Sequence, residues 1–398
     1  MDADRGRIAH GSGPAAPIQA LPLSPLEAAA GLALGHDEHS AFTVGPSQLS
    51  PLEALIAAAT DVLSRGPGFV SFSGGRDSSA VLAAAVLAAR RHGLPDPIPV
   101  TQRFAEVAST DETRWQEMVV DHLGLSRWEV IEIGDELDLL GEIARDVLTA
   151  HGLLWPPNTH FHVPMFRLAT GASLMTGFDG DGVLGSWRWA HAQSVLHGRV
   201  RPVLRDAGRV GLALAPARVR RRLMPRPLLA RVTPWLRPGP QRALEAGARS
   251  YSAAEPRRWD RRLAFYGRAR HVRIPVHSLQ AVGSAHRVSV VHPILDDRFV
   301  SALARAGGAA GIGDRTALMR AVFARALPEA LLARRGKAEF GRAVWQTQAR
   351  AFAESWDGTG VDLRFIDPAR LRSAWRAENP LFGSILPLHM AWLAGQAS

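Results

Sequence analysis

The 398-residue chain contains no cysteine, which excludes disulfides, thiolate metal sites and a cysteine nucleophile. Long apolar runs are absent too. The longest, Ala80 to Ala89, is too short to cross a bilayer and ends at two arginines. Residues 1–45 show no secretory signal, since they begin with mixed charge and continue with Pro, Ala and Gly. We therefore expect a soluble, cytoplasmic protein with no membrane partner.

Lysine is nearly absent as well. The chain has 47 basic residues and a net charge of +10, yet Lys337 is its one lysine. Arginine is a planar fork, whereas lysine is a compact point charge on a slim stem. A lysine kept in such a chain indicates a place where one small ammonium must touch one oxygen, with chance as the alternative. The positive charge could attract nucleic acid, acidic peptide or phosphate, although a bias toward arginine weakens that reading.

The pattern along the chain predicts an α/β fold. Short apolar strands alternate with helices, which is typical of a doubly wound parallel sheet with right-handed crossovers. We expect a loose arm over residues 1–48, a nucleotide-binding core over 49–190 and a mostly helical part over 191–398. The predicted strands cover residues 68–73, 97–104, 128–133 and 172–177.

Residues 199–237 form an arginine-rich segment in which Asp206 is the only acid. Such a segment could bind an acidic partner or a phosphate-rich ligand. The alternative is a solvated helical arm in an arginine-biased protein.

The stretch SGGRDSS, Ser73 to Ser79, lies where the first strand turns into a helix. The first N–H groups of a helix have no intrahelical partner, and paired glycines let the backbone approach a phosphate. A carboxylate beside such a cradle, here Asp77, usually means that a magnesium ion lies between it and the phosphate. The stretch does not fit the Walker A or G-x-G-x-x-G patterns.

SGGRDSS resembles the loop of the PP-loop ATP pyrophosphatases, which cleave ATP between the α and β phosphates and form adenylates. Further stretches resemble asparagine synthetases and β-lactam synthetases of that superfamily, over residues 50–345. These stretches are TDETRW (Thr110 to Trp115), TGFDGDGVLG (Thr176 to Gly185), HRVSVVHPILDDRFVSAL (His286 to Leu303) and RTALMRAVFARALPEALLARRGKAEF (Arg315 to Phe340).

This resemblance implies that the protein binds ATP and Mg²⁺ and joins a carboxylate to an amine. Asp77 and Asp181 match the two metal-binding aspartates, and Lys337 matches a lysine that stabilises charge on the α-phosphate and reacting carbonyl. The positions that match the nucleotide site are Val70, Ser71, Phe72, Ser73, Gly74, Gly75, Asp77, Ser78, Arg103 and Gly177.

The sequence departs from the asparagine synthetase pattern at two places, and each limits what the resemblance implies. Asparagine synthetases carry a glutaminase domain with a cysteine after Met1, but Asp2 stands here, so we expect no glutamine hydrolysis by this chain. Phe178 replaces the glutamate or tyrosine that serves the amine reaction, which leaves Asp179 as a candidate base. A larger carboxylate substrate with its own amine, such as a peptide, therefore fits better than aspartate. His160 and His162 are further candidate bases, with structural roles favoured for both.

Two other functions stay open. A tRNA-modifying PP-loop enzyme such as a lysidine synthetase would use the positive charge, although nucleic acid is disfavoured as a partner because the R-x-K-x-x-F segment belongs to the amide-forming branch. The other alternative is a non-catalytic relative of the synthetases, which is consistent with Phe178 because a phenylalanine cannot transfer a proton. A partner protein could supply ammonia or present the substrate.

Overall fold

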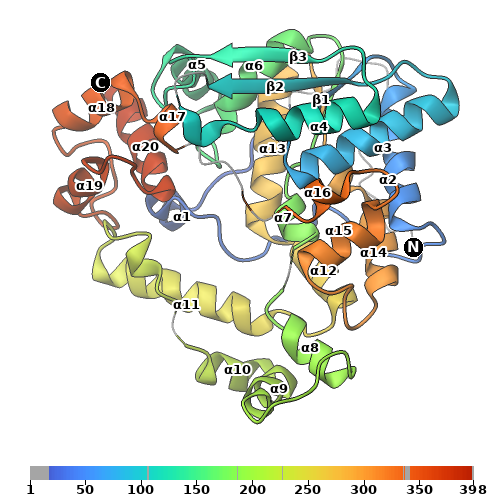
Figure 1. The fold of residues 1–398 in the computed structure, drawn as a ribbon. Coiled ribbons are helices and arrows are strands. Elements are labelled where there is room, and N and C mark those ends of the chain that lie inside the picture. Colours follow the sequence, from blue (N-terminus) through green and yellow to red (C-terminus); the bar gives the residue numbers. More distant parts are fainter. Residues whose placement is uncertain are drawn as a thin grey trace, which may run out of the picture.

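A five-stranded parallel sheet organises the part of the chain that the computed structural model describes, which is residues 18–104, 107–185, 187–225, 227–334, 336 and 341–396 (Figure 1). The strand order is β3-β2-β1-β4-β5, and every neighbouring pair is parallel. The predicted α/β class is therefore confirmed. The strands are β1 (Gly68–Ser71), β2 (Ile98–Phe104), β3 (Glu129–Ile133), β4 (Ser173–Thr176) and β5 (Ser289–Val291).

The fifth strand was not predicted, because β5 is three residues long inside a segment that otherwise reads as helical. The predicted helix after Ser50 is confirmed, as is the one that Gly93 ends with a left-handed φ of 63°. Helices of the first half are α1 (Pro25–Ala30), α2 (Pro51–Leu63), α3 (Arg76–His92), α4 (Thr113–Leu123), α5 (Glu142–His151), α6 (Val163–Leu168) and α7 (Gly180–Val183).

The second half is mostly helical, as predicted. Its helices are α8 (Ala190–Leu196), α9 (Asp206–Leu214), α10 (Ala217–Leu223), α11 (Pro238–Ala254), α12 (Trp259–Gly267), α13 (Arg270–Ala285), α14 (Asp297–Gly307), α15 (Arg315–Phe323), α16 (Glu329–Leu332), α17 (Gly341–Val344), α18 (Thr347–Ser355), α19 (Pro368–Trp375) and α20 (Ile385–Gln396). Within the described ranges, no helix is long and apolar enough to cross a membrane.

Each face of the sheet carries its own apolar core, because successive strand residues point to opposite faces. Val70 and Met175 belong to the cluster that α2, α3, α4 and α14 complete. Phe69 and Leu174 belong to the cluster that includes α5, α13 and the C-terminal helices. The sheet therefore separates two helical layers, as a doubly wound fold requires.

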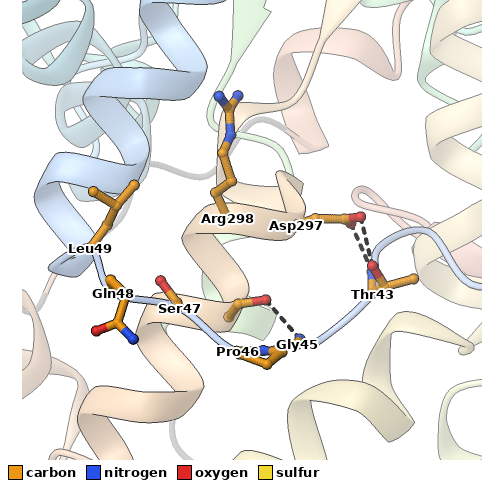
Figure 2. A pocket seen from close by; sticks show the side chains of 9 residues that line it. Thr43, Gly45, Pro46, Ser47, Gln48, Leu49, Asp297 and Arg298 are labelled. Atoms are coloured by element: carbon orange, nitrogen blue, oxygen red, sulfur yellow. Dashed lines mark hydrogen bonds between the residues drawn. The ribbon is translucent and has the colours of Figure 1, made fainter.

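The predicted loose arm over residues 1–48 needs a correction for residues 18–48; residues 1–17 lie outside the described part. Residues 18–48 are not a loose arm. Ser24 and Glu27 form a capping box on α1, and the Glu27 carboxylate accepts from Arg270 at 2.7 and 2.8 Å. Thr43 donates to Asp297 from its backbone N–H at 2.7 Å, and Figure 2 shows this segment lying along α14. Charged and hydroxyl pairs over long sequence separations hold the segment, and no local pattern reveals them.

Candidate active site

The candidate site lies at the carboxyl edge of the sheet, where β1 and β4 are neighbours. The chain runs from β1 to β2 and β3 on one side, and to β4 and β5 on the other. The strand order thus reverses between β1 and β4. Open α/β sheets bind ligands at such a switch point, outside the carboxyl ends of the strands. Asp77 and Asp181 lie in the first turns of α3 and α7, the helices that follow β1 and β4, respectively.

The glycine loop after β1 has the geometry of an anion cradle. Gly74 has a φ of 77°, and a Cβ there would lie 2.9 Å from Gln116 Cγ, so glycine is required twice over. The Ser73 N–H donates to Ser78 Oγ at 3.2 Å, which folds the loop over the start of α3. Gly75 caps α3 without a side-chain acceptor. The first N–H groups of this 17-residue helix are therefore available to an anion.

Asp77 and Asp181 meet at one guanidinium. Nη2 of Arg315, the first residue of α15, donates to both carboxylate oxygens of Asp77 at 2.8 and 2.7 Å, while its Nη1 pairs with Asp181. The Asp77 side chain is 17% exposed and that of Asp181 is 56% exposed, so solvent ions can reach the pair. The carboxylates of Asp77 and Asp181 thus converge on one cationic group, and their role as metal ligands stays a prediction.

Arg315 itself was missed as a site residue. It begins the C-terminal stretch that resembles the synthetases, but the resemblance assigned a role only to Lys337. The contact between Arg315 and Asp77 spans 238 positions. No local periodicity could reveal such a contact, although an arginine at the start of a family-like segment was an available signal.

Two glycines let the loops after β1 and β4 touch. A Cβ on Gly177 would lie 2.6 Å from the backbone nitrogen of Ser78, and a Cβ on Gly180 would overlap the carboxyl group of Asp77. Gly177 was predicted to approach the nucleotide, and it lies directly against the glycine loop. Both positions accept glycine only, because a Cβ would push Asp77 away from Asp181.

Asp179 lies beneath this contact. Its φ is 61°, in the left-handed region, and its Oδ1 accepts from the Tyr266 hydroxyl at 2.8 Å. The other oxygen, Oδ2, is buried with no partner among the described residues. Burial raises the pKa of Asp179 to about 7, against the hydrogen bond from Tyr266 and the charge of Arg262, which lower it. The carboxyl group faces the protein interior here, and its predicted role as a base stays a prediction.

Phe178, which replaces the proton-transferring residue, packs against a buried histidine. The two rings are 5.4 Å apart, and His292 Nδ1 lies 2.7 Å from Thr176 Oγ1. Burial lowers the pKa of His292 to about 3, so this imidazole is neutral at physiological pH. His160 and His162 are likewise neutral, because burial lowers their pKa values to about 3 and about 4.

Of the strand ends that were predicted to belong to the nucleotide site, that of β2 borders a separate cavity of about 360 Å³. Val70 and Phe72 are buried beneath the glycine loop. Arg103, at the end of β2, lines the cavity, donates to Gln116 Oε1 at 3.3 Å and stacks over Trp128 at 4.9 Å. The cavity lies next to the glycine loop, because the Gln116 side chain also packs on Gly74.

Lys337 lies outside the described residues, but the chain that leads to it reaches the glycine loop. Arg334 donates to the Gly74 carbonyl at 3.2 Å, pairs with Glu112 and stacks over Trp115 at 4.8 Å. This contact joins the C-terminal stretch to the loop after β1, as the resemblance implies.

The carboxylates of Asp77 and Asp181 fit a hard cation that completes its coordination with ligands from outside the protein. Among the described residues, no group of three or more His, Asp or Glu side chains could hold a metal alone. Asp77 and Asp181 supply two carboxylates. Magnesium is commonly held by one or two carboxylates, with phosphate oxygens and waters completing its octahedron.

A family model for asparagine synthase matches residues 52–390 of the 398. The match covers both helical layers and the sheet between them. A search of the curated proteins finds no match to the chain.

Proposed function

Because the chain belongs to the asparagine synthase family, whose members are ATP-dependent amide-forming synthetases, we propose that it adenylates a carboxylate and passes the acyl group to an amine. The observation that carries the proposal is the convergence of Asp77 and Asp181 on Arg315 beside the uncapped start of α3. Positive and negative groups are thus arranged for a triphosphate and a metal ion at one sheet edge.

In the first half-reaction, a carboxylate oxygen attacks the α-phosphorus of ATP. The bond to the β-phosphate oxygen breaks, and pyrophosphate leaves with the electron pair. The N–H groups at the start of α3 bind phosphate oxygens, and Arg315 places a fixed charge beside the leaving group. Magnesium, held by Asp77 and Asp181, would neutralise charge on the pyrophosphate. Lys337 is proposed to stabilise the charge on the α-phosphate.

In the second half-reaction, an amine nitrogen attacks the acyl carbon, AMP leaves, and the amine loses a proton. Phe178 cannot accept that proton. These 398 residues contain no cysteine, so we propose that they do not release ammonia from glutamine by a cysteine nucleophile. The amine would come from the substrate itself, from free ammonia or from a partner protein. A peptide or natural-product carboxylate is the proposed substrate class.

Isotope exchange between pyrophosphate and ATP tests the proposal. We expect Mg²⁺-dependent exchange with at least one carboxylate in a panel that includes aspartate and acidic peptides, and AMP as the product. Release of ADP and phosphate would refute adenylation. Nucleotide binding without exchange across the panel would instead favour a non-catalytic relative. Salt-sensitive tRNA binding with exchange that requires tRNA would favour the tRNA-modifying alternative.

A further inference from the structure

The arginine-rich segment of residues 199–237, here the basic arm, also exposes large aliphatic side chains. It contains α9 and α10, which lie at the bottom of Figure 1, away from the sheet. Of the fifteen exposed large hydrophobic side chains among the described residues, eight lie in this arm. They are Val200, Val203, Leu204, Leu214, Val219, Leu223, Leu228 and Val232. Contiguous exposed apolar patches on soluble proteins often mark interaction sites, and this one segment holds more than half of the exposed large apolar side chains.

The charge of the arm is one-sided and largely uncompensated. Its single acid, Asp206, is buried and already accepts from His191 at 2.8 Å and from the Val203 backbone at 3.1 Å. On α10, Arg218, Arg221 and Arg222 are spaced to share one helical face, and within the described residues none of them forms an ion pair. Arg209 lies 3.4 Å from Asp206, but the three arginines of the α10 face present positive charge without an ion-pair partner among the described residues.

Apolar and basic groups alternate closely enough to touch the same partner. Val219 and Leu223 are four residues apart on α10, next to the arginine face, and Leu223 is 66% exposed. Leu204, in the turn before α9, is 95% exposed. A partner that fits must offer anionic groups above an apolar layer.

We propose that the basic arm docks on an anionic phospholipid surface. Lipid phosphates would face the arginines, while Leu204 and Leu223 would enter the acyl boundary, as in other interfacial helices. Leu and Val are under-represented among the residues that anchor protein interfaces, so the exposed aliphatic side chains of the arm fit a lipid boundary better than a protein partner. Single-stranded nucleic acid needs stacking aromatics. None of the described arm residues is an exposed aromatic, since Trp235 is fully buried.

The expectation of no membrane partner rested on the absence of a run long enough to span a bilayer. Peripheral docking requires no such run. The arm lies outside the candidate nucleotide site, so this inference does not depend on the proposed reaction, and pyrophosphate exchange is measured separately.

Vesicle co-sedimentation of the full chain tests the proposal. One set of vesicles contains equal parts phosphatidylcholine and phosphatidylglycerol, and the other contains phosphatidylcholine alone. We expect binding to the anionic set at physiological ionic strength and none to the neutral set. The triple variant R218Q/R221Q/R222Q should lower the partition coefficient about 100-fold. The double variant L204S/L223S should lower it about 10-fold or more.

A matched control removes the same charge elsewhere. The triple variant R127Q/R364Q/R370Q takes three arginines whose side chains are 60% exposed or more, on other parts of the surface, and should bind vesicles like the wild type. Equal losses in both triple variants would mean that net charge alone drives binding, and would overturn the proposal. So would wild-type binding by L204S/L223S, or an absence of binding to anionic vesicles. Preferential binding of the arm to RNA, insensitive to the leucine changes, would overturn it in favour of nucleic acid.

Discussion

Replacing Asp179 with asparagine should stabilise the protein at neutral and alkaline pH. The carboxyl group is enclosed beneath the contact between the two loops, and its Oδ2 atom has no partner among the described residues. Burial raises its pKa from 3.8 to about 7. Asparagine has nearly the same shape, can still accept from the Tyr266 hydroxyl, and tolerates the φ of 61° better than most residues.

The size and sign follow from proton linkage. Between pH 4 and pH 7 the folded state keeps the Asp179 proton and the unfolded state has lost it, so wild-type stability falls as pH rises. Each pH unit costs about 1.4 kcal/mol, and the full shift corresponds to about 4 kcal/mol. The carboxamide of the variant cannot titrate. Asp179→Asn should therefore match the wild type near pH 4 and exceed its unfolding free energy by up to about 4 kcal/mol at pH 8.

Urea denaturation followed by circular dichroism, at several pH values between 5 and 8, measures this difference. Asp121→Asn removes an exposed carboxylate on α4 and serves as the control whose pH dependence stays that of the wild type. If Asp179→Asn and the wild type lose stability in parallel across this range, the enclosed carboxyl does not titrate as reasoned here. The same variant tests catalysis, because loss of amide formation with intact pyrophosphate exchange would make Asp179 the base.

Three further changes probe the site. Lys337→Arg should abolish pyrophosphate release yet leave ATP binding measurable, by calorimetry; near-normal turnover would contradict the assigned role. Asp181→Asn should raise the Mg²⁺ concentration needed for half-maximal exchange, and an unchanged titration would count against the metal assignment. Gly180→Ala should cut exchange about 100-fold, because its Cβ displaces Asp77. Gly208→Ala, on α9 with open space around its Cβ, is the matched control and should leave exchange unaltered.

Much of the fold could be predicted because local patterns report it. The strand, glycine turn and alanine-rich helix around Asp77 lie together in sequence, so their arrangement follows from short-range chemistry. The alternation of strands and helices also predicted the parallel sheet and hence the shared edge for Asp77 and Asp181. β5 was not predicted, because a strand of three residues is too short to show a recognisable periodicity.

The missed features depend on contacts between distant segments. Arg315 meets Asp77 only after the helical half folds back onto the sheet. Asp179 appeared in the sequence as a loop acid free to accept protons, yet Tyr266 and the surrounding burial hold it inside. The packing of residues 18–48 rests on pairs such as Glu27 with Arg270, more than two hundred positions apart. Tertiary contacts of this kind leave no periodic signal.

Positive charge is concentrated around the glycine loop, where phosphate is proposed to bind. Arg76, Arg315 and Arg334 all lie against this loop, and the hydrogen bonds of Arg76 within the described residues go to neutral oxygens, those of Thr316 and Leu332. Burial, together with the charges of Arg315 and Arg334, lowers the pKa of Arg76. Gathering like charges beside an uncapped helix start opposes folding, and such costs concentrate at functional sites. On the proposed function, a triphosphate would relieve that repulsion and would also supply the oxygens that two aspartates leave open on a metal ion, so that one ligand would satisfy both halves of the site.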